Sequence, residues 1–221
     1  RVPISANTSF DLASLAKQFT VYATCLLIDQ GVIAKSDDIK IYLPELPDFG
    51  YQITVGNLLH HTSGLRDWTS TFPLAGKTFD NVISYDQILR MVQEQQELNF
   101  TPGTKYAYSN TGYNLLVEII QRVTGISFRA WTDQNIFSPL GMKNTLFLDN
   151  HNEVISNRAT AYYKDENGRY NYTPNNLTAL GSSSLYSTTT DLAKWVNHLM
   201  YPEGKWKPVV ERMFQTEVLN N

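Results

Sequence analysis

Residues 12–31 read LASLAKQFTVYATCLLIDQG and carry the strongest helical pattern in the chain. Large apolar side chains such as Leu15 and Phe19 recur at the spacing of one helix face. Almost every side chain from 19 to 28 is apolar or small, which is typical of a helix that is buried on most of its faces. The stretch therefore predicts a buried helix that ends at Gly31.

The composition is that of a folded chain without a strongly charged partner. Of its 221 residues, 42% are hydrophobic and 18% are charged, which argues against disorder. Lys and Arg total 18 and Asp and Glu total 21, so the net charge of −3 provides no basic surface for nucleic acid or an anionic membrane. No stretch approaches the roughly 18 consecutive apolar residues of a membrane span. Cys25 is the only cysteine, which excludes an intrachain disulfide and a thiolate zinc cluster.

Further helices are predicted where a capping residue precedes an apolar pattern and Gly or Pro follows it. Residues 66–84 are rich in Thr, Ser, Gly and aromatic side chains and predict irregular structure, whereas 141–180 predicts strands and loops. The tail after residue 202 has no clear pattern. The predicted helices span residues 55–60, 84–97, 110 or 111 to 124, 127–137 and 191–200.

Ser14 and Lys17 are three residues apart, so on a helix they share one face. A serine hydroxyl becomes a nucleophile when a base takes its proton, and a lysine can do so when burial depresses its pKa. Lys17 follows Ala16 and precedes Phe19 in apolar surroundings, and backbone N–H groups at the helix start could stabilise an oxyanion. The same spacing also fits a solvated lysine beside a helix cap, so the pair alone leaves both interpretations open.

Tyr108 and Asn110 stand between a Pro102-Gly103 turn and a buried helix. A phenol can relay a proton between nucleophile and leaving group when a cation lies nearby, and an amide can hold both Lys17 and a substrate amide. The alternative interpretation is an aromatic helix cap, in which Asn110 opens the helix and Tyr108 packs beneath it.

Five blocks of sequence, taken together, resemble one known family. They read TSFDLASLAKQFT at 8–20, LLHHTSGL at 58–65, FTPG at 100–103 leading to YSNTGY at 108–113, PLGMKNT at 139–145, and ST at 187–188 followed by DLAKW at 191–195. In this order they resemble the penicillin-recognising serine hydrolases, which include class C β-lactamases, D-alanyl-D-alanine peptidases and related esterases. The resemblance spans nearly the whole chain and implies an α+β, β-lactamase/transpeptidase-like fold.

The resemblance implies a role for each of four residues. Ser14 would be the acylated nucleophile, with its own N–H in the oxyanion hole, and Lys17 its general base. Tyr108 would protonate the leaving group and later help to activate water, and Asn110 would bind substrate and orient Lys17. The substrate would be a small molecule or short peptide, namely a β-lactam, a D-Ala peptide or an ester, without any metal or organic cofactor. The family also implies export to the periplasm or the extracellular space.

His60 and His61 are adjacent and precede Thr62-Ser63-Gly64, which would fit a Ser–His pair or a metal site. Neighbouring residues on a helix point about 100° apart, so two such rings seldom share a metal. The resemblance gives this loop a structural role instead. Cys25, in the middle of a buried helix, is expected to be an inert small hydrophobic residue.

Two departures from the family pattern bear on completeness. The family carries a third Lys/His-x-Gly motif on the strand that walls the active site, and no such motif follows Tyr113. Only about a dozen residues precede Ser14, and the chain begins at Arg1. We therefore expect residues 1–221 to form a single, incomplete domain, mainly the helical region, with most of the central antiparallel sheet missing at both ends.

That expectation has two consequences. The helix over 14–30 would expose an apolar face too large for a monomer, so either another chain would cover it or the chain would be unstable by itself. The chain could also be a non-catalytic scaffold or binding relative of the same fold, or be inactive because the third motif is lost. Residues 181–184 read GSSS where the family tends to carry paired glycines, which leaves the backbone conformation there open.

Overall fold

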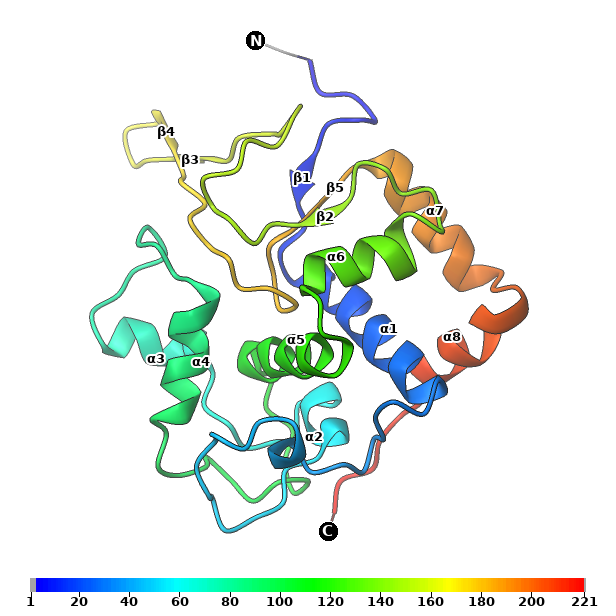
Figure 1. The fold of residues 1–221 in the computed structure, drawn as a ribbon. Coiled ribbons are helices and arrows are strands. Elements are labelled where there is room, and N and C mark those ends of the chain that lie inside the picture. The colour runs from blue at the N-terminus through cyan, green and yellow to red at the C-terminus, as the bar shows by residue number, and fades with distance from the viewer. Residues whose placement is uncertain (1–2, 221) are drawn as a thin grey trace.

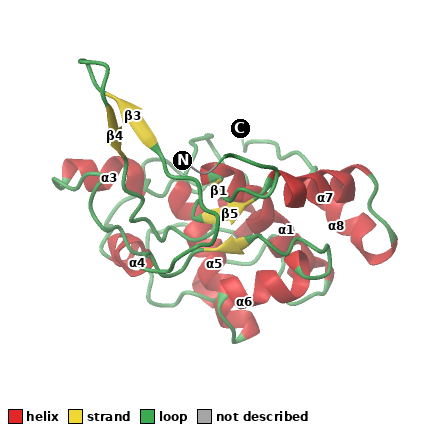
Figure 2. Cartoon of the chain, turned by 90° about the horizontal axis from the view of Figure 1, so that it is seen from above, coloured by secondary structure: helices red, strands yellow, loops and turns green. Residues whose placement is uncertain are grey.

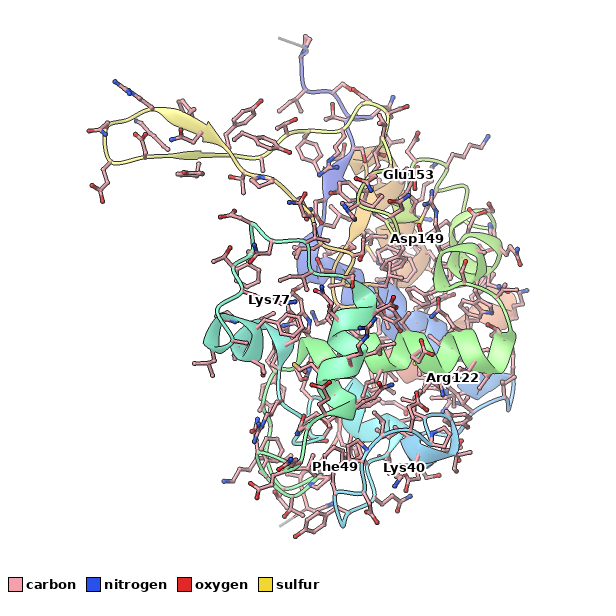
Figure 3. The ribbon with its side chains drawn as sticks, turned by 60° about the vertical axis from the view of Figure 1, so that its left-hand side comes forward. Lys40, Phe49, Lys77, Arg122, Asp149 and Glu153 are labelled. Atoms are coloured by element: carbon pink, nitrogen blue, oxygen red, sulfur yellow. The ribbon has the colours of Figure 1, made fainter. Side chains whose placement is uncertain are left out.

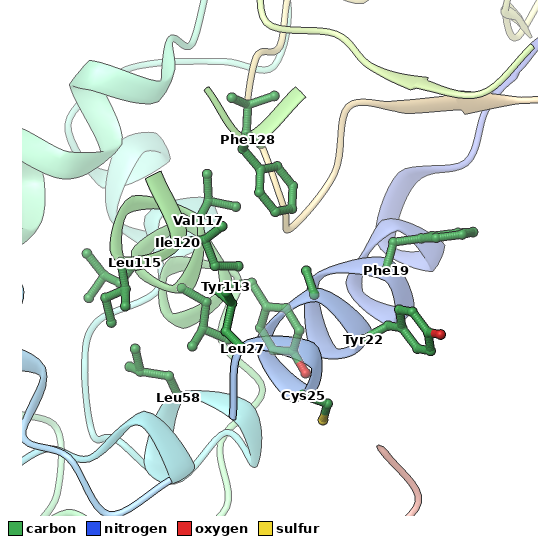
Figure 4. Close-up of a cluster of buried hydrophobic side chains, with 14 of the residues drawn as sticks. Phe19, Tyr22, Cys25, Leu27, Leu58, Tyr113, Leu115, Val117, Ile120 and Phe128 are labelled. Carbon is green, nitrogen blue, oxygen red and sulfur yellow. The ribbon is translucent and has the colours of Figure 1, made fainter. Parts of the chain in front are cut away.

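Two long helices, α1 (Ala16–Asp29) and α5 (Asn110–Thr124), form the centre of the computed structural model, which describes residues 3–220 (Figure 1). Their apolar faces meet in the main core, part of which Figure 4 shows with Leu27 of α1 and Val117 and Ile120 of α5. Each such buried aliphatic side chain stabilises the fold by about 1.5–3 kcal/mol relative to an exposed one. The prediction of a buried helix within residues 12–31 is therefore confirmed.

The other helical elements are shorter than these two, and α7 (Thr189–Met200) is the longest of them. Between α1 and α5 lie α2 (Val55–Leu59), α3 (Trp68–Leu74) and α4 (Tyr85–Gln93), and after α5 come α6 (Phe128–Thr132), α7 and α8 (Lys207–Met213). Single helical turns cover Ala13–Leu15, Ile39–Ile41, Asp133–Phe137 and Gly204–Trp206.

The apolar face of α1 is covered within the chain. α8 packs along α1 and buries Val209 and Val210 in the main core, while α5 packs against α1 from another side (Figure 1). Between Phe19 and Leu27 only Val21 is less than fully buried. The expectation of a large exposed apolar face is therefore wrong for the described residues, because the unassigned tail folds into α8.

The strands are few and short, as the sequence predicts. β1 (Phe10–Asp11), β5 (Leu185–Ser187) and β2 (Leu146–Phe147) form an antiparallel sheet in that order, with Phe10 opposite Ser187 and Leu146 opposite Tyr186. β3 (Tyr162–Lys164) and β4 (Tyr170–Tyr172) form a separate antiparallel hairpin that projects from the body (Figure 2). The β1–β5 pairing matters most, because β1 leads directly into the turn before α1.

The prediction of irregular structure over 66–84 is wrong in part, because α3 lies within it. The Asp67 side chain caps this helix by accepting from the Thr69 N–H at 2.8 Å. Trp68 and Phe72, one turn apart, are buried in a second small core. Tertiary burial of this aromatic pair outweighs the low helix propensity of the Thr and Ser residues around it.

Helix ends differ from prediction by a few residues. α4 ends at Gln93 rather than near residue 97, and α7 begins two residues before the predicted start because Thr188, not Thr190, caps it. α5 begins and ends as predicted, with Gly125 in the left-handed conformation at φ 72°.

Surface ion pairs lie at the C-terminal end of α5 and on α6, and Figure 3 labels three residues that form them, Arg122, Asp149 and Glu153. Arg122 donates to Glu118 at 2.8 Å, to Glu45 at 2.9 Å and to the Tyr42 carbonyl at 2.9 Å. On the other side, Arg129 pairs with Asp149 and Glu153, which lie beyond β2 (Figure 3). Single exposed pairs contribute little to stability, but the three acceptors on Arg122 hold the C-terminal turn of α5 in place. Among residues 3–220, none of the helices has the length and apolarity needed to cross a bilayer.

Candidate active site

Ser14 lies on the exposed turn that connects β1 to α1. The preceding residue, Ala13, has φ 45°, a left-handed conformation that is unusual for a residue with a Cβ. Asp11 accepts from the Ala13 N–H at 2.9 Å and so supports this turn. The turn sets Ser14 one helical turn before Lys17, and the Lys17 Nζ lies 3.3 Å from the Ser14 Oγ. Ser14 and Lys17 therefore lie on one face of this helical segment, as the sequence predicts.

Lys17 is buried, and its ammonium nitrogen has partners from three segments of the chain. Besides the Ser14 Oγ, the Nζ donates to the Asn110 Oδ1 at 2.7 Å and to the Ser182 carbonyl at 2.8 Å. Two fixed acceptors use two N–H groups, so the third direction at the nitrogen faces Ser14. In the ammonium form that direction carries a proton, and in the neutral amine it carries the lone pair. A proton can therefore move between the two residues without rearrangement of the heavy atoms.

Burial lowers the pKa of Lys17 to about 8, because the charged form loses hydration, and the carboxylate of Asp67 opposes part of that change. A substantial share of the side chain is consequently neutral slightly above neutral pH. A neutral amine beside an exposed serine hydroxyl is the arrangement that general-base activation requires.

Tyr108 lies close to Lys17. The Lys17 Nζ is 4.8 Å from the centre of the Tyr108 ring, and about half of the Tyr108 side chain is exposed. Asn110 begins α5 two residues later, after Ser109, whose Oγ caps the helix by accepting from the Gly112 N–H at 3.2 Å. The structure thus brings together all four residues that the sequence singled out, Ser14, Lys17, Tyr108 and Asn110.

His61 supports the loop that carries Tyr108. Its carbonyl accepts from the Ala107 N–H at 2.9 Å, and its Nδ1 accepts from the Ser109 N–H at 3.0 Å. The ring stacks on Tyr108, with centroids 4.6 Å apart, and on Tyr113, with centroids 5.0 Å apart. Burial and the nearby Lys17 charge lower the pKa of His61 to about 4, so the ring is neutral and Nδ1 is free to accept. His61 therefore has a structural position within the site, and His60 lies apart from it, beside Glu217.

Two further contributors were not predicted from the sequence. One is the Ser182 carbonyl on Lys17, a backbone group to which no side-chain pattern points. The other is Asp67, which accepts from both the backbone N–H and the Nδ2 of Asn110, the latter at 3.2 Å. Asp67 follows the LLHHTSGL block by two residues, and its cap position before Trp68 was the only available signal.

Two residues of the GSSS segment adopt the left-handed backbone conformation that glycine favours. Gly181 has φ 82° and Ser184 has φ 61°, and the segment holds the Gly181 and Ser182 carbonyls against α1. Cys25 is buried, and burial raises the pKa of its thiol to about 12, so the thiol stays protonated.

Comparison with known proteins identifies the class. A family model described as Beta-lactamase matches residues 1–220, and the chain belongs to the β-lactamase family. Its α+β architecture, rich in helices and with small antiparallel sheets, is the β-lactamase/transpeptidase-like fold, and penicillin-recognising serine hydrolases are the wider group in which it falls.

Two curated relatives and one solved structure are similar to this chain over most of its length. Penicillin-binding protein 4* of Bacillus subtilis (strain 168) is 30% identical over 99% of this chain and 51% of its own length. A D-aminopeptidase of Gluconobacter oxydans is 27% identical over 88% of this chain and 36% of its own. The octameric penicillin-binding protein homologue from Pyrococcus abyssi superposes with a TM-score of 0.82 at 25% identity, covering 96% of this chain and 49% of that one. The chain therefore spans about half the length of these relatives or less.

Proposed function

We propose that this protein is a serine hydrolase that works through an acyl-enzyme on Ser14. The observation that carries the proposal is the bonding of Lys17, whose buried nitrogen is fixed by Asn110 and Ser182 so that its third direction faces the Ser14 hydroxyl. Membership of the β-lactamase family and the names of the relatives support a hydrolase in general.

In the proposed reaction, neutral Lys17 takes the Ser14 proton as the Oγ attacks the substrate carbonyl carbon. The carbonyl oxygen becomes an oxyanion, which the Ser14 N–H would stabilise. The tetrahedral intermediate collapses when its bond to the leaving group breaks, and Tyr108 passes the proton from Lys17 to that group. Water then attacks the ester, gives up a proton through the same residues and releases the acid, which restores Ser14. Asn110 would hold the substrate while it accepts from Lys17.

For the substrate, we propose a peptide or amide with a D-configured residue beside the scissile bond. The support is that relatives carry the names penicillin-binding protein and D-aminopeptidase. A β-lactam or an ester needs the same four residues, so a panel of nitrocefin, a D-Ala-D-Ala peptide, a D-aminoacyl anilide and p-nitrophenyl esters distinguishes the classes. Turnover of only the esters would reject the D-amide assignment. We also propose that residues 1–221 belong to a single catalytic domain and that the protein is exported to the periplasm or the extracellular space.

The competing proposal is a non-catalytic scaffold or binding protein. One observation favours it, namely that no Lys/His-x-Gly motif follows Tyr113 in this sequence.

Covalent labelling distinguishes the proposed serine hydrolase from the non-catalytic scaffold. A fluorophosphonate or fluorescent β-lactam should label the purified protein, and Ser14→Ala should abolish labelling. Ser138→Ala, which alters an exposed serine on a distant turn, is the matched control and should label normally. Failure of both probes to label the wild-type protein would favour the scaffold.

A further inference from the structure

Among residues 3–220, Asp67 is the one carboxylate that hydrogen-bonds to a residue of the proposed site, and it contacts Asn110 from the side opposite Lys17. Its Oδ2 accepts from the Asn110 backbone N–H and from the Asn110 Nδ2 at 3.2 Å. Its Oδ1 lies 3.3 Å from the same Nδ2 and also accepts from the Thr69 N–H at 2.8 Å, which anchors the carboxylate to the start of α3. Asn110 bridges the two charged residues, since its Oδ1 accepts from the Lys17 Nζ and its Nδ2 donates to Asp67.

The chemistry of the two partners fixes the orientation of the Asn110 amide. A carboxylate can only accept hydrogen bonds, so the NH2 group of Asn110 must face Asp67. The amide oxygen must then face the Lys17 Nζ, which lies 2.7 Å away. Without Asp67, the amide could turn over and donate from its NH2 group to the lone pair of neutral Lys17. That lone pair is the one that must take the Ser14 proton.

We propose that Asp67 is a positioning residue of this site, which holds the Asn110 amide so that the lone pair of Lys17 stays directed at Ser14. This inference rests on the proposed function for its catalytic consequence, but its structural content concerns Lys17 and Asn110 whether or not the protein is an enzyme.

The charge of Asp67 also acts on Lys17 and opposes the effect of burial on the Lys17 pKa. The other titratable groups that face Lys17 are His61, from the loop after α2, and Tyr108 and Tyr113, whose ring centres lie 4.8 and 5.5 Å from the Nζ. His61 is neutral near pH 8, because its pKa is lowered to about 4. Loss of the Asp67 charge should therefore lower the Lys17 pKa further, and a flipped amide would add to that decrease.

The test compares Asp67→Ala and Asp67→Asn with the wild-type protein. The Lys17 pKa is read from an NMR titration of ¹³C-labelled lysine, assigned with Lys17→Arg, so that the signal reports Lys17 alone. Both variants should give a lower Lys17 pKa than wild type. Acylation by the fluorophosphonate should fall roughly 10- to 100-fold, the cost of a displaced catalytic group, and its rise with pH should begin at lower pH.

Asp38→Asn is the control, since Asp38 caps the helical turn Ile39–Ile41 in the same way and none of its hydrogen bonds reaches a site residue. It should keep this cap, because an amide oxygen can also accept from the Lys40 N–H, and it should leave the Lys17 pKa and acylation unchanged. An unchanged Lys17 pKa in a folded Asp67 variant would overturn the proposal, as would failure of both Asp67 variants to fold. If the Lys17 pKa falls but the wild-type protein is never acylated, the positioning role stands and the proposed hydrolase does not.

Discussion

At the scale of single residues, Lys17 decides what the site can do. An ordinary solvent-exposed lysine is protonated at neutral pH and cannot act as a base. Here burial lowers its pKa to about 8, and two fixed acceptors leave one direction of the nitrogen for Ser14. The sequence indicated this from the apolar neighbours of Lys17, but not the size of the effect, which depends on groups far away in the chain.

The pH dependence of acylation follows from that pKa. Protonated Lys17 cannot take the Ser14 proton, so the rate of acylation should rise with pH through an ionisation near 8 and level off above it. Lys17→Ala should remove this dependence and reduce the rate by about 10²–10⁴-fold. Labelling kinetics between pH 6 and 10 measure both effects. A rate for Lys17→Ala close to that of wild type would show that another group is the base.

His61 predicts a second pH effect, on stability. The pKa of His61 is lowered to about 4 in the folded protein from its ordinary 6.5, so between these values the unfolded chain binds more protons. The contribution of neutral His61 to the free energy of unfolding should therefore be fully present above pH 6.5 and should decrease as the pH falls toward 4. A proton on Nδ1 would also face the Ser109 N–H, and two donors repel.

Replacement of His61 by Asn tests this effect, because Asn tolerates the φ of 58° at this position. His61→Asn should be less stable than wild type at pH 7 and lose less stability between pH 7 and 5, as measured by urea denaturation. His151→Asn, on a surface turn, serves as the control. Equal losses in wild type and His61→Asn would contradict the assignment.

At the scale of elements, the start of α5 sets the geometry of Tyr108 and Asn110, which flank the cap residue Ser109. The cap was predictable only in general terms, because Asn110 and Thr111 could equally have opened the helix. The Ser109 Oγ decides it by accepting from the Gly112 N–H at 3.2 Å. In the same way, α3 could not be predicted from 66–84, since its stability comes from burial of Trp68 and Phe72 and not from helix propensity.

Removal of this cap should affect stability and acylation together. Ser109→Ala should lower the free energy of unfolding by about 1 kcal/mol and slow acylation, because both neighbours of Ser109 belong to the site. Ser84→Ala removes the equivalent bond at the start of α4, where the Ser84 Oγ accepts from the Gln87 N–H at 3.3 Å. That control should lose similar stability with unchanged labelling. If Ser84→Ala slows acylation as much, the effect of Ser109→Ala is one of global stability.

At the scale of the whole molecule, the site depends on the close packing of the segment before β5 against both central helices. A Cβ placed on Gly181 would lie 2.3 Å from the Val117 Cγ2 and 2.9 Å from the Tyr113 carbonyl. The Gly181 carbonyl accepts from Thr20 at 2.9 Å, and the next carbonyl binds Lys17. The absence of a side chain at Gly181 is thus what allows the segment to reach Lys17.

Gly181→Ala should therefore destabilise the protein by more than the cost of placing alanine in a left-handed backbone conformation. Gly168→Ala is the matched control, since Gly168 has φ 78° but only the Lys164 Cε within reach of a new Cβ, at 3.5 Å. The control should cost about 1–2 kcal/mol for the left-handed conformation. Gly181→Ala should cost about 1–3 kcal/mol more from overpacking and should also slow acylation. Equal costs in thermal unfolding would contradict the packing argument.

Local periodicity and linear motifs are visible in the sequence, and they account for part of the fold and of the site. The spacing of Ser14 and Lys17 places them on one helix face, Gly125 ends α5, and the ordered blocks identify the family. The motifs also pointed to Asn110, 93 residues away, as a partner of Lys17. Only the fold showed the other fixed acceptor, the Ser182 carbonyl 165 residues away, because a backbone carbonyl has no side-chain pattern. The fold also placed α8 over α1 and Asp67 behind Asn110. The physical reason is that hydrogen bonding and burial between distant segments depend on how the helices pack, and packing leaves no periodic signal in the chain.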